Sequence, residues 1–124
     1  MTPALRRSQG CIILTSSGAA VKGMGTWGAY GSSKAALNHL AQTLATEVEE
    51  VTSISVAPGV VDTEMQRELR DVHSLSMREQ DAARFHNLHK EGSLLKPEQP
   101  GNLMARLVLN APKEFSGKFI RYGL

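Results

Sequence analysis

Residues 11–18 of this 124-residue chain read CIILTSSG, and this stretch decides the fold class. An apolar run that ends in hydroxyl side chains and a glycine is typical of a parallel strand buried on both faces. In open parallel α/β sheets, ligands bind outside the carboxyl ends of the strands, and Ser16 and Ser17 stand at that end. The stretch therefore predicts a doubly wound parallel sheet with a binding edge at these serines.

A glycine-rich loop and a long helix are predicted to follow this strand. Residues 18–28 contain four glycines, which indicates a loop across the carboxyl edge of the sheet. Leucines and alanines then recur at helical spacing over residues 28–48, which predicts one amphipathic helix. Trp27 is predicted either to line a substrate pocket or to pack the loop onto the core, and the sequence leaves both interpretations open.

Tyr30 and Lys34 lie four residues apart on this predicted helix, so their side chains share one face. A nearby ammonium group and the positive start of a helix both stabilise a phenolate, which suits Tyr30 to general acid–base chemistry. A hydroxyl at the end of the strand would then donate to a carbonyl oxygen of the substrate. The competing interpretation is an ordinary αβ unit with both side chains on its surface.

Three features together resemble the short-chain dehydrogenase/reductase family. They are the strand ending in Ser17, the Tyr30-x-x-x-Lys34 pattern thirteen residues later (30 − 17 = 13), and the later stretch ISVAPGVVDT at residues 54–63. The resemblance implies Ser17, Tyr30 and Lys34 as catalytic residues, and the spacing selects Ser17 over Ser16. It also implies that Lys34 holds the nicotinamide ribose and assists Tyr30.

The same resemblance implies where a nicotinamide cofactor binds. In the family, the backbone at the position of Val61 hydrogen-bonds the nicotinamide carboxamide, and the hydroxyl at the position of Thr63 contacts the same part. Thr63 also reads as a helix cap, which is compatible with that role. The implied cofactor-binding residues are Tyr30, Lys34, Pro58, Gly59, Val61 and Thr63, and the implied substrate-binding residues are Ser17, Trp27 and Tyr30.

The implied reaction is hydride transfer between NAD(P)H and a carbonyl carbon, with Tyr30 as general acid or base. NADP is slightly preferred over NAD as the cofactor, although no residue in this chain selects between them. The segments around residues 58–65 and 90–101 resemble small fungal reductases related to sepiapterin and benzil reductases. An activated ketone or diketone is therefore the expected substrate, and the corresponding alcohol is expected in the reverse direction.

The family's glycine-rich turn, Thr-Gly-x-x-x-Gly-x-Gly, does not occur in this sequence. Residues 1–124 are therefore predicted to form a single incomplete NAD(P)-binding Rossmann-type domain, the carboxyl-terminal catalytic half with about three parallel strands. The alternative is a truncated, non-catalytic fragment that binds no cofactor on its own. Loss of neighbouring strands is also predicted to expose an apolar edge on the strand at 11–15.

The remaining segments predict helices and two further strands, the first of them at 54–57. Helices are expected at 64–71 and 77–90, in a lobe that closes over substrate in the family. Pro97 and Glu98 suit the start of another helix, and a last strand is expected at 117–120. The buried stripe of the helix after Pro97 is predicted to comprise Leu103, Met104, Leu107 and Val108.

Composition excludes several classes of function. Lysine and arginine total 14 and aspartate and glutamate total 12, so the net charge of +2 requires neither nucleic acid nor an anionic membrane as partner. No apolar run reaches the ~20 residues that span a bilayer, so a cytoplasmic protein is expected. The one cysteine, Cys11, is expected to be a buried, inert thiol.

Two further predictions concern metals and partners. His86 and His89 lie three apart on a predicted helix, but no further ligand completes a zinc site, so no metal and no metal-dependent hydrolase is expected. The helix at 28–48 has a face of small alanines, and in the family the matching helix often forms a subunit interface. A homodimer or homotetramer through this helix is the corresponding expectation.

Overall fold

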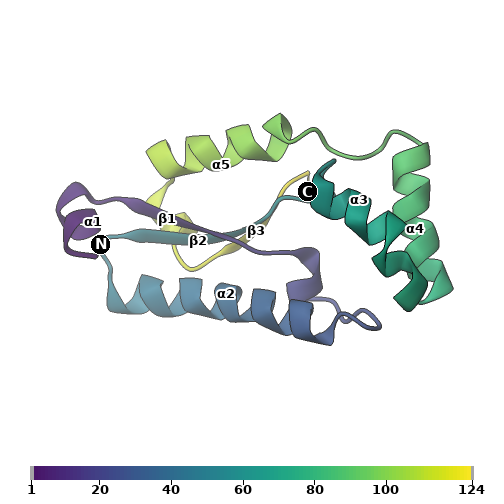
Figure 1. Cartoon of the computed structure of the whole chain (residues 1–124). Coiled ribbons are helices and arrows are strands. Elements are labelled where there is room, and N and C mark those ends of the chain that lie inside the picture. The colour runs from purple at the N-terminus through teal and green to yellow at the C-terminus, as the bar shows by residue number, and fades with distance from the viewer. Residues whose placement is uncertain (1, 124) are drawn as a thin grey trace.

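The computed structural model describes residues 2–123, and it contains one sheet of three parallel strands (Figure 1). The strands are β1 (Cys11–Thr15), β2 (Thr52–Ala57) and β3 (Phe119–Arg121), in the order β1-β2-β3. Ile13 is paired with Ile54, and Val56 with Ile120. The predicted α/β fold with about three parallel strands is confirmed.

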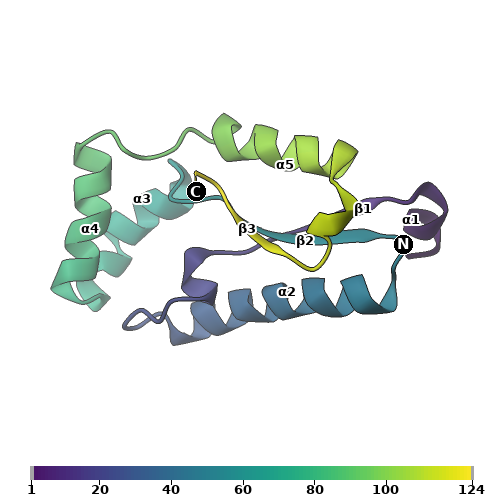
Figure 2. The ribbon, with the colours of Figure 1, turned by 180° about the vertical axis from the view of Figure 1, so that it is seen from behind.

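Helices cover both faces of the sheet and stand beyond one end of it (Figures 1 and 2). Helix α2 (Gly28–Glu47) lies on one face and α5 (Glu98–Asn110) on the other, while α1 (Thr2–Ser8) leads into β1. Beyond the carboxyl ends of the strands lie α3 (Glu64–Asp71) and α4 (Glu79–Lys90). Short 3-10 turns are η1 (Gly18–Ala20), η2 (His73–Ser76) and η3 (Lys113–Phe115).

The core lies between β2 and α5. All six residues of β2 are buried, and Ile54, Val56 and Leu107 form its centre. Leu103 and Met104 pack against this cluster as predicted. The prediction was wrong for Val108, which is 48% exposed because it follows Leu107 directly and so points away from the sheet.

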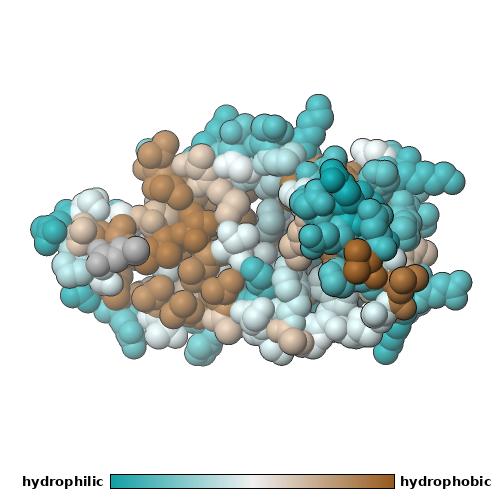
Figure 3. Space-filling model, in the orientation of Figure 1, coloured by the Kyte–Doolittle hydropathy of each residue, from teal (hydrophilic) through white to brown (hydrophobic). Residues whose placement is uncertain are grey.

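Strand β1 is half-buried instead of buried on both faces, as its sequence had suggested. In residues 2–123 it pairs only with β2, so its other edge carries unpaired backbone groups. Hydrophobic surface gathers between α2 and α5 on this side of the molecule (Figure 3). The predicted exposed apolar edge is thus present in the described structure.

Some element boundaries differ from the prediction. Strand β2 begins at Thr52 instead of Ile54, because the Thr52 N–H already donates to the Gly10 carbonyl at 3.0 Å. Strand β3 begins at Phe119 instead of Gly117, because Gly117, with φ +81°, still belongs to the preceding turn, and it ends one residue later than predicted, at Arg121. The helices over residues 28–47 and 64–71 are confirmed, and α4 begins two residues later than predicted.

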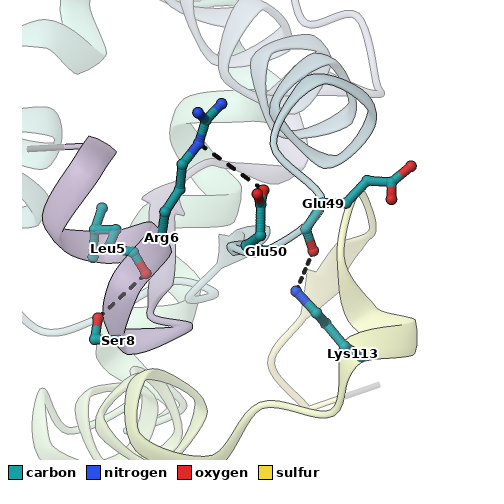
Figure 4. A network of polar contacts seen from close by, with 6 residues as sticks. All are labelled: Leu5, Arg6, Ser8, Glu49, Glu50 and Lys113. Atoms are coloured by element: carbon teal, nitrogen blue, oxygen red, sulfur yellow. Dashed lines mark hydrogen bonds and ion pairs between the residues drawn. The ribbon is translucent and has the colours of Figure 1, made fainter.

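Polar contacts tie the connections together at the amino end of the strands (Figure 4). Arg6 and Glu50 form an exposed ion pair at 3.9 Å, and the Lys113 ammonium donates to the Glu49 carbonyl. Exposed pairs of this kind contribute about 0–1 kcal/mol, so burial of β2 dominates the stability. No helix in the described residues is long and apolar enough to cross a membrane.

Candidate active site

Ser16 and Ser17 directly follow β1 and lie in different environments. Ser16 is 3% exposed, and its hydroxyl donates to the Lys34 carbonyl at 3.4 Å. Ser17 is half-buried and caps η1, with its hydroxyl oxygen accepting the Ala19 N–H at 3.2 Å. Because this oxygen acts as an acceptor, the Ser17 hydroxyl proton remains available for a ligand, whereas the Ser16 hydroxyl is occupied by the backbone of α2.

Tyr30 and Lys34 share one face at the start of α2, as predicted. The Lys34 ammonium lies 5.7 Å from the centre of the Tyr30 ring and donates to the Thr15 carbonyl at 2.9 Å. This bond directs the ammonium group toward the carboxyl end of β1, where Ser17 also stands. A hydroxyl donor, a phenol and a cation therefore meet at one edge of the sheet.

Gly31 allows α2 to start in direct contact with η1. A Cβ atom at this position would lie 2.9 Å from the Ala19 carbonyl oxygen, closer than real Cβ contacts. At Gly28, in the same helix, a Cβ atom would meet nothing within 4 Å. The close approach at Gly31 brings the helix that carries Tyr30 against the turn that Ser17 caps.

Gly31→Ala is therefore expected to lower the free energy of unfolding by about 1–3 kcal/mol, because the added methyl group must displace backbone. Gly28→Ala is the matched control, and it is expected to leave stability unchanged or raise it by less than about 1 kcal/mol. Urea unfolding followed by the fluorescence of Trp27, the one tryptophan of the chain, measures both. Equal stability of the two variants would contradict the close packing at Gly31.

Trp27 packs between α2 and α4. Its ring meets Tyr30 edge to face at 5.2 Å between centroids and stacks on Phe85 at 5.7 Å. It also lines a cavity of about 700 Å³ at the carboxyl edge of the sheet. Both structural roles considered for Trp27 are therefore present, and substrate contact remains a prediction.

This cavity brings together every site residue predicted from the sequence. Ser17 lines it from the start of η1, Tyr30 and Lys34 line it from α2, and the loop after β2 contributes the predicted cofactor residues Pro58, Gly59, Val61 and Thr63. Sequence reasoning missed other lining residues, among them Met24 in the glycine-rich loop and Arg84, Phe85 and Arg121 from more distant segments. Of these residues, only Arg121 could have been placed from the sequence, because it directly follows the strand predicted at 117–120 and so lies at the binding edge.

The loop after β2 is held by a bridge that the sequence did not predict. The Leu95 N–H donates to the Val60 carbonyl at 2.9 Å, and the Asp62 N–H donates to the Leu95 carbonyl at 2.8 Å. Within residues 2–123 the N–H of Val61 itself meets no acceptor. The Thr63 hydroxyl accepts the Gln66 N–H at 3.3 Å, which confirms its predicted role as the cap of α3.

The remaining candidate residues lie apart from this cavity. His86 and His89 are exposed on α4, and the described residues contain no group of three side chains able to hold a metal ion. Cys11 is half-buried at the opposite end of β1, where burial raises the pKa of its thiol. A raised pKa keeps the thiol protonated near neutral pH and therefore poorly reactive.

A family profile and two characterised relatives all match this chain to the same family of enzymes. The profile of the short chain dehydrogenase family matches residues 1–74. A benzil reductase ((S)-benzoin forming) of Saccharomyces cerevisiae is 44% identical over 117 residues, which cover 91% of this chain and 44% of that protein. Sepiapterin reductase of Rattus norvegicus is 41% identical over 69 residues, covering 56% of this chain and 25% of that enzyme.

Solved structures agree with these matches. The crystal structure of a short chain dehydrogenase/reductase from Saccharomyces cerevisiae superposes with a TM-score of 0.95 at 40% identity. The match covers 98% of this chain and 49% of that one. The chain thus spans about half the length of the relatives that it matches over most of its own length.

Proposed function

This chain belongs to the short-chain dehydrogenase/reductase family, and we propose that it carries the catalytic residues of an NAD(P)-dependent carbonyl reductase. The observation that supports the proposal most strongly is that Ser17, Tyr30 and Lys34 line one cavity at the carboxyl edge of the sheet. Names of relatives support carbonyl reduction, since two of them are a benzil reductase and a sepiapterin reductase.

The residues present fit the nicotinamide end of such a cofactor. The free N–H of Val61 would donate to the carboxamide, and Lys34 would bind the ribose hydroxyls. The nicotinamide end of the cofactor would also be bordered by Pro58, Gly59 and Thr63. When bound, the reduced nicotinamide supplies a hydride to the carbonyl carbon.

Three side chains of the chain would act on the carbonyl oxygen. The Ser17 hydroxyl donates a hydrogen bond that positions and polarises it, and Tyr30 transfers its phenolic proton to the oxygen as the alcohol forms. The Lys34 ammonium stabilises the resulting phenolate by its charge, as does the start of α2. In the direction of oxidation the same groups work in reverse.

An activated ketone or a diketone is the proposed class of substrate, and NADP is the slightly preferred cofactor. Trp27, Phe85 and Met104 give the cavity an apolar and partly aromatic lining, which suits a small hydrophobic carbonyl compound better than a sugar. Two of the relatives named above, the yeast benzil reductase and the rat sepiapterin reductase, favour the same class.

A second candidate is a chain that is non-catalytic and binds no cofactor by itself. The sequence has no Thr-Gly-x-x-x-Gly-x-Gly turn, and such a turn supplies the backbone amides that bind a pyrophosphate. For this reason the catalytic experiments below use the chain fused to the dinucleotide-binding half of a related reductase.

Helix α2 is the proposed subunit interface. Its outward face exposes Ala29, Ala36 and Leu40, the last with 43% of its surface accessible. Small residues on a helix let a second helix approach closely, which would suit a homodimer or homotetramer.

The comparison of Ser17→Ala with Ser16→Ala tests the proposed roles. In the fused reductase, Ser17→Ala is expected to lower kcat by about 10²–10³-fold, the usual cost of losing a donor to a developing oxyanion. Ser16→Ala is expected to have little effect on the rate, because its hydroxyl makes only the 3.4 Å bond to the Lys34 carbonyl. A larger loss from Ser16→Ala than from Ser17→Ala, in steady-state kinetics, would contradict the assignment.

A further inference from the structure

All the charged side chains that line the cavity at the carboxyl edge are positive. Its ionisable cations are Lys22, Lys34, Arg84 and Arg121, and no aspartate or glutamate is among its lining residues. The whole chain is nearly balanced, with 14 basic and 12 acidic residues, so the one-sided lining is local. The proposed reaction uses Lys34, and it leaves the other three cations without a role.

Arg121 lies at the same edge of the sheet as the proposed reacting centre. It is the last residue of β3 and pairs in register with Ala57, which places it at the carboxyl edge. Its side chain reaches across the end of β2, since a Cβ atom at Gly18 would lie 3.1 Å from its Nη2 atom. Gly18 directly follows Ser17, and both Ser17 and Arg121 line the same cavity, so the guanidinium group lies close to the residue proposed to bind the carbonyl.

No protein group in the described chain neutralises this guanidinium. Within residues 2–123, no carboxylate oxygen lies within 4.0 Å of it, and its side chain donates no hydrogen bond. A guanidinium carries five N–H donors in a planar fork that matches the two oxygens of a carboxylate. Its position and its open donors favour an anionic group on the ligand.

We propose that Arg121 is a specificity-determining residue that binds a carboxylate adjacent to the reacting carbonyl, as in a 2-oxo acid. The proposal rests on the proposed function for the identity of the reacting carbonyl. Lys22 and Arg84 lie further along the same cavity and raise its positive potential, which attracts such an anion. The cofactor's phosphates are the competing anion, and the test below separates the two.

The test uses the 124-residue chain without cofactor and reads the fluorescence of Trp27, which lines the cavity. The two probes are 4-methyl-2-oxopentanoate and its methyl ester, which differ in charge but hardly in shape. The acid is expected to bind at least about tenfold more tightly than the ester, the usual effect of a charge-assisted bidentate contact. Arg121→Met should remove this preference, and Arg121→Lys should retain part of it.

Arg106→Met is the matched control, because Arg106 is exposed on α5 and does not line the cavity. It removes the same charge and is expected to leave the preference for the acid unchanged. Equal binding of acid and ester, absence of binding by both, or an equal loss in Arg106→Met would each overturn the proposal. So would an Arg121→Met variant that keeps the preference.

A second measurement keeps this outcome distinct from that of the proposed function. In the fused reductase, Arg121→Met should raise KM for the acid and leave both the KM for NAD(P)H and turnover of the neutral ester unchanged. A weakened interaction with NAD(P)H would instead assign Arg121 to the cofactor's phosphates and overturn the proposal. A reductase that turns over only the ester would leave the proposed function standing without the role of Arg121.

Discussion

Tyr30→Phe is expected to lower kcat of the fused reductase by at least about 10²–10⁴-fold, the usual contribution of a general acid. This corresponds to about 3–5 kcal/mol of activation free energy. The phenylalanine keeps the ring that packs edge to face on Trp27 but removes the hydroxyl that protonates the substrate oxygen. Stability and the KM for NAD(P)H should therefore change little.

Two measurements check this expectation together. Steady-state kinetics give kcat and KM, and urea unfolding followed by Trp27 fluorescence shows that the variant folds like the parent. A Tyr30→Phe enzyme with the turnover of the parent would show that another group supplies the proton. A loss of turnover that merely tracks a loss of stability would show a structural role for the ring.

Lys34→Met is expected to damage both turnover and cofactor binding, because one ammonium group is proposed to serve Tyr30 and the nicotinamide ribose. Its position favours this double role, since it lies 5.7 Å from the Tyr30 ring and reaches the Thr15 carbonyl at the sheet edge. We expect KM for NAD(P)H to rise about tenfold, as for a lost charge-assisted hydrogen bond. Turnover should fall at least as far.

Lys90→Met is a suitable control for this variant, because Lys90 is exposed at the end of α4 and lies outside the cavity lining. It should leave both kinetic constants unchanged. If Lys34→Met altered turnover while leaving the KM for NAD(P)H as in the parent, the proposed contact with the ribose would be wrong. Steady-state kinetics at varied cofactor concentration decide between these outcomes.

The local part of the candidate site could be predicted from the sequence because its geometry follows from short spacings. Tyr30 and Lys34 share a helix, so their separation of four residues fixes their common face. Ser17 follows a strand that is recognisable from four consecutive apolar or small residues before Thr15. Each of these inferences needed fewer than twenty residues of context.

The rest of the cavity depends on contacts between distant segments, which spacing does not reveal. Phe85 reaches Trp27 from α4, and Leu95 bridges to Val61 across the intervening helices. Arg121 arrives through the register of β3 on β2, and the cation has no local pattern around it. The predicted strand at 117–120 placed Arg121 near the binding edge, but the sequence alone does not show that its side chain lines the same cavity as Ser17.

Two strand errors have a common physical origin in side-chain polarity and pairing. The start of β2 was missed because Thr52 and Ser53 are polar, and polar side chains are typical of loops. Both residues are nevertheless buried, at most 5% exposed. The Ser53 N–H donates to the Ser116 hydroxyl at 3.0 Å, a contact made across the fold. Conversely, the apolar run of β1 reads as fully buried, while its burial depends on pairing at an edge that is open in the described structure.

Carbonyl reduction at this site is tested most directly by measuring hydride transfer in the fused reductase. NAD(P)H that carries deuterium at the transferring position of its nicotinamide ring is mixed with a vicinal diketone, and the alcohol product is analysed by mass spectrometry. We expect one deuterium on the new carbinol carbon with the parent, and a rate at least about 10²-fold lower with Tyr30→Phe. Product without deuterium, or equal rates in the two proteins, would contradict carbonyl reduction at the Ser17–Tyr30–Lys34 site.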